Sequence, residues 1–348
     1  MKNYKVFSFV IALALCVTFL VGCAGKSKPK LYVFNWGDYI NTEIISDFEK
    51  EFDCKVVYRD FATNEDLYVK ITNSKDPIDV IFPSEYMFER MKKENLLEKI
   101  DTNKITNLNN LNEIFSKKNV DPSNEYSVPY FWGTVGIVYN SEKYPDGFKK
   151  FADLWDEKYA KDIVIYNSQR DVFMMALRKL GYSMNTRDRD ELEQAKEELM
   201  KQKPLVYGYL GDEIKDVLAA EEANIGLVYS GDAGFITNLN SKYKYVLPEE
   251  GTNLWFDVAC IPKQFQNKEL AEEFLNYLLR PEVAAKNAEY LQYATPVTKA
   301  LELLPEELVN NKALYPDDKD LENTEVFHDI SDIIKLYDEI WTEFTSGI

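Results

Sequence analysis

Between residues 31 and 91, apolar positions alternate between the two-residue period of a β-strand and the 3.6-residue period of an α-helix. After the first strand, one helical stripe carries Ile40, Ile44, Ile45, Phe48 and Phe52. Asn41 stands where a side chain would cap that helix. The pattern predicts strands over 31–35, 54–60 and 79–82, and helices over about 41–52, over 64–71 and from Ser84 onward.

The same alternation returns between residues 163 and 229. It predicts strands over 163–166 and 225–229 and helices over 170–180, about 188–202 and 212–222. The first of these helices stops at Gly181, a residue suited to a left-handed C-cap. Two apolar stretches, 128–139 and 255–262, are predicted to be extended crossovers between the halves of the chain. The C-terminal third is predicted to be helical.

This alternation predicts an α/β fold with a mostly parallel sheet and helices on both faces. Two such halves joined by extended crossovers predict two α/β lobes around a cleft, where ligands bind at the carboxyl ends of strands. We assign residues 31–134 plus about 262–322 to lobe 1, and 135–261 plus about 323–348 to lobe 2. No internal repeat is visible.

The N-terminal segment has the pattern of a signal peptide. Lys2 and Lys5 precede a run of about 15 apolar residues, shorter than the ~20 that a membrane-spanning helix needs. The sequence Leu-Val-Gly-Cys at residues 20–23 resembles the lipobox of bacterial lipoproteins, which implies removal of 1–22 and lipidation of Cys23. Residues 23–30 would be a basic tether. The alternative is an ordinary secretory signal with an incidental cysteine. Either alternative places the protein outside the cytoplasm. If Cys23 carries lipid, we expect the protein to be anchored on the outer face of the cytoplasmic membrane or on the periplasmic side.

Charge and cysteine content limit the kinds of ligand, metal and macromolecular partner that we expect the protein to bind. The chain has 41 basic and 59 acidic residues, a net charge of −18, which disfavours nucleic acid and favours cations. Once residues 1–23 are set aside, only Cys54 and Cys260 remain, both in apolar strand-like runs. With one histidine, His328, which we expect to be solvated, we predict no metal site.

The most informative candidate pair is Trp255 and Asp257. Strand alternation puts both on one face of a run, 254–261, that is otherwise uncharged. A carboxylate there needs hydrogen bonds or a cation, because burying it alone costs several kcal/mol. An internal salt bridge is the alternative to a ligand.

Other candidates follow predicted strands or helix ends. Each has a simpler alternative: a turn at a helix start for Asp38, an N-cap for Ser84, a capping box for Asp171, a backbone-bonded turn for Asp232, and lobe packing for Tyr293. The set is Trp36, Asp38, Tyr39, Ser84, Tyr86, Asp171, Tyr229, Asp232 and Tyr293. Aromatic faces hold ammonium groups by about 0.5–2 kcal/mol each, and carboxylates add charge-assisted hydrogen bonds. Together they suit a small organic polycation with methylene segments.

Several stretches resemble the bacterial spermidine/putrescine-binding proteins. They are Leu31–Ile40, Thr63–Glu65, Asp79–Ser84, Val128–Gly133, Ala176–Ser183, Trp255–Asp257 and Asn276–Val283, in a match that is collinear from about residue 30 to the end. The resemblance implies the type II periplasmic-binding-protein fold, no enzyme activity, no cofactor, a monomer, and delivery of polyamines to the permease of an ABC importer.

The resemblance also implies that Trp36, Tyr39, Ser84, Tyr86, Asp171, Tyr229, Trp255, Asp257 and Tyr293 line the pocket, with Asp257 gripping an amine in the middle of the site. Three departures leave the choice of polyamine open. Ser168 stands where spermidine-preferring members usually have a carboxylate, and a Gln expected near Phe327 is missing. Tyr229 stands where the family often has Trp, so one stacking face is smaller. Asp232 resembles an acid of putrescine-preferring members, which favours putrescine slightly.

Three other functions remain open from the sequence. A two-lobed secreted enzyme could use paired carboxylates, as glycosidases do, but each acid here is paired with an aromatic ring. A binding lipoprotein could serve a sensor or an adhesin. A ferric-ion binder would use some of the 23 tyrosines, but such sites favour adjacent tyrosines on one loop, and none occurs here.

Overall fold

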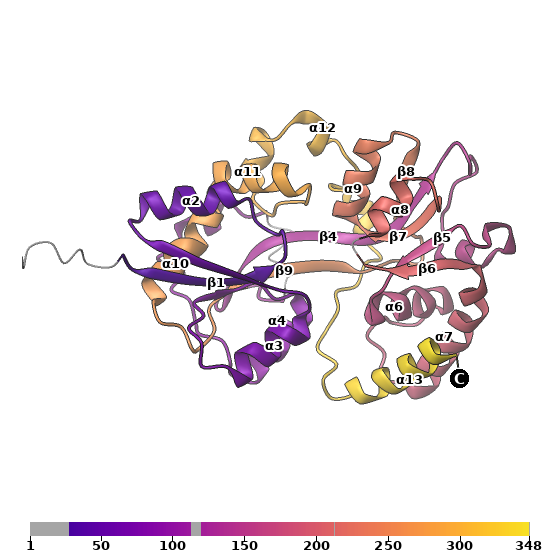
Figure 1. The fold of residues 1–348 in the computed structure, drawn as a ribbon, viewed down its shortest axis with the longest axis horizontal. Helices are drawn as coiled ribbons and strands as arrows, with labels where there is room; N and C mark the ends of the chain where they lie inside the picture. Colours follow the sequence, from indigo (N-terminus) through magenta and orange to yellow (C-terminus); the bar gives the residue numbers. More distant parts are fainter. Residues whose placement is uncertain (1–27, 113–119, 212, 348) are drawn as a thin grey trace, which may run out of the picture.

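The computed structural model describes residues 28–112, 120–211 and 213–347. Two lobes lie side by side in Figure 1 and are joined by strands β4 (Ser127–Asn140) and β9 (Leu254–Cys260), which run from one lobe to the other. The predicted signal segment and Cys23 lie outside the described residues. No helix in the described ranges combines the length and the apolar character needed to span a membrane.

One mixed sheet passes through both lobes in the order β2-β1-β3-β9-β4-β7-β5-β6, with β8 paired to β4. The other strands are β1 (Lys30–Trp36), β2 (Lys55–Phe61), β3 (Val80–Ile81), β5 (Ile163–Tyr166), β6 (Val206–Leu210), β7 (Ile225–Tyr229) and β8 (Tyr243–Val246). β4 pairs with β9 as far as Thr134 and with β7 from Val135 onward. The lobe boundaries given above remain a prediction.

Strand direction departs from the predicted, mostly parallel sheet at the crossovers. β1 is parallel to β2 and β3, and β5 is parallel to β6 and β7. β4 and β9 are antiparallel to each other and to their other neighbours. The reason is that β4 carries the chain from lobe 1 to lobe 2 and β9 carries it back, so these two crossing strands run in opposite senses.

Lobe 1 has three layers because its strands bury both faces. Leu31, Val33 and Val56 face one side of the sheet, covered by α2 (Thr42–Glu51), α10 (Lys268–Leu278) and α11 (Pro281–Leu291). Phe34 and Ile81 face the other side, covered by α3 (Asn64–Asn73) and α4 (Glu85–Lys93). The alternation along β1 is the expected two-residue period.

Lobe 2 repeats this arrangement. α6 (Gln169–Leu180), α7 (Arg189–Gln202) and the C-terminal α13 (Ile334–Ser346) lie below the sheet in Figure 1. α8 (Ile214–Ala219) and α9 (Ser230–Leu239) lie above it and bury Val138, Val164 and Val228. Gly181 adopts the left-handed conformation (φ 82°) expected of a C-cap.

Short helices complete the fold: η1 (Thr106–Asn110), η2 (Phe151–Trp155), η3 (Glu157–Tyr159), η4 (Lys203–Leu205), η5 (Thr298–Leu303), α12 (Glu306–Val309) and η6 (Asp318–Leu321). The sequence pattern did not indicate β6 or β8, because only the first residue of each is buried and the apolar alternation is weak. Cys54 and Cys260 are both free and buried, as small apolar residues would be.

Candidate functional site

The site centres on Asp257, a buried carboxylate on β9 with a relative exposure of 7%. One carboxylate oxygen accepts a hydrogen bond from the Ser84 hydroxyl at 2.7 Å, and the other accepts one from the Tyr39 hydroxyl at 2.7 Å. Within the described ranges, no lysine or arginine pairs with Asp257 or lowers its pKa. The internal salt bridge considered for this residue is therefore absent from the part of the chain that the structure describes.

Local structure explains how the two hydroxyls reach Asp257. Ser84 occupies the N-cap position of α4, but its side chain makes no capping hydrogen bond and turns to Asp257 instead. Tyr39 lies in the turn after β1, where its backbone carbonyl accepts from the Tyr130 hydroxyl at 2.6 Å. Both side chains are thus fixed by the ends of lobe 1 strands, where ligands of open α/β sheets bind.

Burial raises the pKa of Asp257 from its usual 3.8 to about 6, although the hydrogen bonds from Ser84 and Tyr39 oppose this shift. At neutral pH the group is mostly ionised, yet no described lysine or arginine is paired with it. An ammonium group of a ligand would compensate the negative charge of Asp257 and would therefore bind favourably at this site.

A second carboxylate lies in lobe 2. Asp171, in the first turn of α6, is 3% exposed and accepts a hydrogen bond from the Tyr229 hydroxyl at 2.7 Å. Its other oxygen is buried and has no hydrogen-bond partner among the residues that the structure describes. The Ser168 hydroxyl does cap α6 by accepting from the Asp171 backbone N–H at 3.4 Å, but the Asp171 carboxylate does not complete a capping box. Burial raises the pKa of Asp171.

Aromatic rings connect these two acids. Ring centroids are 5.7 Å apart for Tyr39 and Tyr293, 5.7 Å for Tyr293 and Trp255, and 6.2 Å for Trp255 and Tyr229. The first ring bonds to Asp257 and the last to Asp171. A line of aromatic side chains thus runs from Asp257, which is bonded to Tyr39 and Ser84 of lobe 1, to Asp171 of lobe 2.

Two glycines allow these rings to approach the backbone. A Cβ atom on Gly133 would lie 2.5 Å from the Trp255 ring, and one on Gly231 would lie 2.4 Å from the Tyr293 ring. Contacts this short do not occur between real atoms, so any larger residue would displace the ring. These glycines position the aromatic line.

Three other predicted residues belong to lobe 1, at or after the ends of its strands. Trp36 is half-buried at the end of β1, with its ring centroid 4.6 Å from that of Phe61, and its buried indole N–H has no partner within the described ranges. Tyr86, in the first turn of α4, accepts from the Asn64 amide at 3.0 Å and donates to Glu65 at 3.4 Å. Asp38 is exposed in the turn after β1, with a left-handed φ of 45°.

Asp232 has a different environment from Asp257. It is 6% exposed in the first turn of α9, and its carboxylate lies 3.5 Å from the ammonium group of Lys215 on α8. A lysine of the same lobe therefore already compensates part of its charge. A ligand amine that used Asp232 would have to share the carboxylate with Lys215.

Sequence reasoning missed two charged residues near the site. Glu85, next to Ser84, is 1% exposed and accepts from the Phe256 backbone N–H at 3.1 Å, and burial raises its pKa well above the usual range. Arg170, next to Asp171, lies over the Phe327 ring at 4.2 Å and is 5.8 Å from the Tyr86 ring. The sequence could have pointed to both residues, because Glu85 directly follows the predicted site residue Ser84 and Arg170 directly precedes Asp171.

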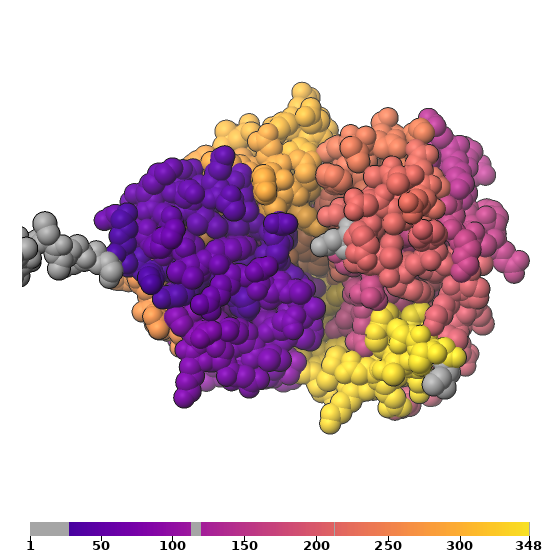
Figure 2. All heavy atoms as spheres, viewed as in Figure 1, coloured from indigo at the N-terminus to yellow at the C-terminus, as the bar shows by residue number. Residues whose placement is uncertain are grey.

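Figure 2 shows a furrow between the N-terminal lobe, in indigo and purple, and the lobe in orange-red and magenta. Within the residues described here, no group of three or more His, Cys, Asp or Glu side chains is arranged to hold a metal ion. Fold and site together are those of a two-lobed binding protein whose inter-lobe site joins carboxylates to aromatic rings.

Comparison with known proteins identifies the family. Residues 43–316 match the family model of bacterial extracellular solute-binding proteins, so the chain belongs to that family. It is 39% identical over 324 residues to the spermidine/putrescine-binding periplasmic protein of Salmonella typhimurium, covering 92% of this chain and 93% of that protein. This agreement confirms the family resemblance and the two-lobed solute-binding fold inferred from the sequence.

Solved structures of related proteins have the same fold as this chain. The spermidine/putrescine ABC transporter substrate-binding protein PotD of Streptococcus pneumoniae superposes with a TM-score of 0.82 at 38% identity, over 91% of this chain and 99% of that chain. The Tp0655 (TpPotD) lipoprotein of Treponema pallidum superposes with a TM-score of 0.81 at 27% identity, over 90% of this chain and 99% of that chain.

Proposed function

We propose that this protein captures a polyamine such as putrescine or spermidine outside the cytoplasm and delivers it to the permease of an ABC importer. The observation that carries this proposal is Asp257, a buried carboxylate with two hydroxyl donors and, among the described residues, no cationic partner. The names of the relatives, spermidine/putrescine-binding protein and ABC transporter substrate-binding protein, support the same ligand and partner.

The ligand would lie along the aromatic line. One ammonium group would sit at Asp257, methylene groups would pack on Tyr293 and Trp255, and a second ammonium group would approach the unpaired oxygen of Asp171. Rings that pack the methylenes also attract the adjacent cationic ends, at about 0.5–2 kcal/mol per contact. This arrangement requires two amines separated by an alkyl chain, and it gives binding without any chemical step.

Calorimetric titration with putrescine, cadaverine, spermidine and spermine tests the proposal directly. We expect saturable binding of at least one of them by the purified protein, as a monomer. An alkyl monoamine of similar length is the matched control, because it can occupy only one of the two carboxylates. Equal affinity for the monoamine and the diamine, or no binding of any polyamine, would contradict this function.

We further propose that lipid on Cys23 holds the protein at the membrane. The support is the Leu-Val-Gly-Cys sequence at residues 20–23, together with a structural relative that is itself named a lipoprotein. Cys23→Ser should move the protein out of the membrane fraction and prevent normal processing. A Cys23→Ser protein that keeps its mature mass and stays with membranes after a high-salt wash would disprove the anchor.

A further inference from the structure

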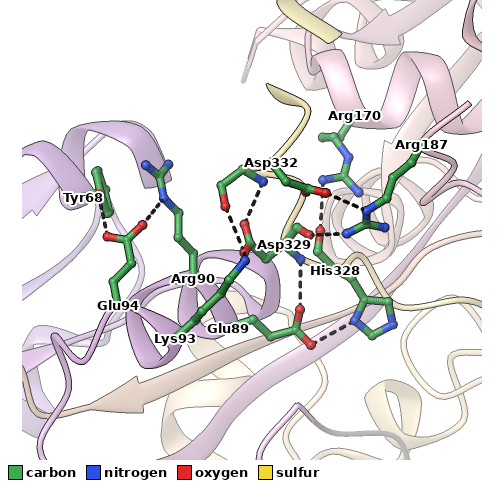
Figure 3. A network of polar contacts seen from close by, with 11 residues as sticks. Tyr68, Glu89, Arg90, Lys93, Glu94, Arg170, Arg187, His328, Asp329 and Asp332 are labelled. Atoms are coloured by element: carbon green, nitrogen blue, oxygen red, sulfur yellow. Dashed lines mark hydrogen bonds and ion pairs between the residues drawn. The ribbon is translucent and has the colours of Figure 1, made fainter. Parts of the chain in front are cut away.

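A second set of contacts joins the lobes away from the aromatic line. On α4 of lobe 1, the Glu89 carboxylate contacts the His328 ring nitrogen Nδ1 at 2.9 Å and accepts from the Asp329 backbone N–H at 2.9 Å. One helical turn further along α4, the Lys93 ammonium group donates to the Asp329 carboxylate at 3.2 Å. Figure 3 shows these contacts together, and we refer to the four residues as the inter-lobe clamp.

The segment that carries His328 and Asp329 is fastened to lobe 2. The Asn185 amide oxygen accepts from the His328 backbone N–H at 2.9 Å, and Arg170 donates to the His328 carbonyl at 3.3 Å. Arg187 donates to the Asp329 carbonyl at 2.8 Å. Because α4 packs on the lobe 1 sheet through Phe88 and Met91, the clamp ties one lobe to the other.

The helices that carry the clamp also carry ligand-site residues. Ser84 is the N-cap of α4 and Tyr86 lies in its first turn, and the same continuous helix carries Glu89 and Lys93. Arg170, which holds the His328 carbonyl, directly precedes Asp171 on α6. A change in the separation of Glu89 and His328 therefore moves the two halves of the ligand site relative to each other.

We propose that Glu89 and His328 are positioning residues that hold the lobes together around the ligand, and that this clamp tightens when His328 is protonated. The proposal rests on the polyamine-binding function above and adds a pH-dependent control of lobe closure. It assigns a task to the single histidine of the chain, which was expected from the sequence to be merely solvated.

Charged groups from every neighbouring element surround the segment that carries His328, and of these Glu89, Arg170 and Arg187 act on its ring. These groups are Glu89 and Lys93 from α4, Arg170 from α6, Arg187 from the loop before α7, and Asp329 and Asp332 from its own segment. The hydrogen bond to Glu89 raises the pKa of His328, while burial and the two arginines act in the opposite direction. The net shift is upward, so contact with Glu89 dominates.

The sign of the pH effect follows from this shift. A histidine whose pKa is raised by contact with Glu89 stabilises the joined lobes fully below its ordinary pKa of 6.5, and this stabilisation is lost as pH rises through the higher value. The clamp should therefore strengthen ligand binding at pH 5.5 and contribute little at pH 8.5. Because the His328 side chain is 54% exposed, the effect should be modest, about two- to fivefold in Kd.

The test compares putrescine and spermidine affinity of the wild type and His328→Gln at pH 5.5 and 8.5. At each pH, the ratio of the Kd of His328→Gln to the Kd of the wild type isolates the contribution of the clamp. Other pH-dependent groups, including Asp257, are common to both proteins. We expect His328→Gln to weaken binding about two- to fivefold at pH 5.5 and less than that at pH 8.5. Glu89→Gln should remove the same pH dependence.

Glu94→Gln is the matched control. Glu94 follows α4 directly and pairs with Arg90 and Tyr68, so its contacts stay within lobe 1 (Figure 3). We expect its Kd ratio to the wild type to be the same at both pH values. An equal pH-dependent loss in Glu94→Gln, or a pH-independent ratio for His328→Gln, would overturn the proposal.

A measurement without ligand separates this proposal from the polyamine function. Nitroxide labels on Val69→Cys in α3 and Tyr207→Cys in β6, both exposed positions, report the separation of the lobes by pulsed electron paramagnetic resonance. We expect the distance distribution to change between pH 5.5 and 8.5, and this change to disappear with His328→Gln. An unchanged distribution overturns the clamp, whereas absence of polyamine binding overturns only the function proposed above.

Discussion

Two buried aspartates, Asp257 on the crossover strand β9 and Asp121 in lobe 1, differ in how their charge is compensated. Asp121 is 0% exposed and accepts from the backbone N–H groups of Tyr126 at 2.8 Å and Ser127 at 3.0 Å, from the Ser127 hydroxyl at 3.1 Å, and from the Lys92 ammonium group at 3.1 Å. Among the described residues, Asp257 accepts hydrogen bonds only from the hydroxyls of Ser84 and Tyr39. The charge of Asp121 is compensated by groups of the fold itself, whereas the charge of Asp257 is available to a cationic ligand.

The difference lies in the donors. Backbone N–H groups and a nearby lysine are fixed parts of the fold, so Asp121 stabilises the fold in which it sits. Hydroxyl groups can rotate to serve a carboxylate and then a ligand, and they bring no charge. Burial class alone does not separate a structural acid from a binding acid; the nature of the partners does.

The largest effect expected from this comparison is on ligand affinity. Asp257→Ala should weaken polyamine binding by about 2–5 kcal/mol, or roughly 30-fold or more, because a desolvated ammonium group would lose its counter-charge. Calorimetry measures the affinity, and thermal unfolding checks that the variant is folded. Binding within threefold of the wild type would remove Asp257 from the centre of the site.

Asp121→Ala should lower the stability of the fold and leave polyamine affinity unchanged. It leaves two backbone N–H groups without an acceptor and Lys92 without its partner, which should lower the free energy of unfolding by about 1–3 kcal/mol. Polyamine affinity of the folded fraction should stay at the wild-type value. Denaturant titration and calorimetry on the same sample separate the two effects, and a selective loss of affinity would contradict the assignment of Asp121 to structure.

The ionisation of Asp257 provides a test by pH. Its pKa of about 6 lies above that of a free carboxyl, so without a ligand cation this group favours folding at low pH and loses that contribution as pH rises through about 6. Ligand binding requires the ionised form and should lower this pKa. Affinity should thus rise roughly tenfold per pH unit below 6 and level off above it.

The same pH series on Asp257→Asn supplies the control. This variant has no group to ionise at position 257, so its weaker binding should lack the steep rise below pH 6. Proton release on binding, measured by titration in two buffers of different ionisation enthalpy, should also vanish. A steep pH profile that survives in Asp257→Asn would assign the titration to another residue.

The smallest effect concerns Asp232. Because Lys215 lies 3.5 Å from its carboxylate, Asp232→Ser should reduce putrescine affinity by only about 1 kcal/mol, less than tenfold. Lys215→Gln should raise that affinity, since it makes the carboxylate available to a ligand amine. If neither change alters putrescine binding, Asp232 only positions the turn into α9, and the slight preference for putrescine loses its basis.

Much of the fold could be predicted from the sequence. Periodicity identified β1, α2, β2, α3 and α4 in order, since each buries a face whose residues recur at the period of its own backbone. β6 and β8 could not be found in this way, because their exposed positions leave no apolar alternation to detect. The antiparallel direction of β4 and β9 likewise depends on how the chain crosses between lobes.

For the site, the sequence determined the residue types and the tertiary structure decided their partners. Asp257 stands out in the sequence as a lone charge in an apolar strand, and Tyr39 and Ser84 follow other strands. Only the fold brings Tyr39 and Asp257, 218 positions apart, to 2.7 Å, and only the fold gives Asp232 a lysine while leaving Asp257 without a described cation. The reason is physical: local sequence sets backbone period and capping, whereas charge compensation depends on neighbours that come from distant parts of the chain.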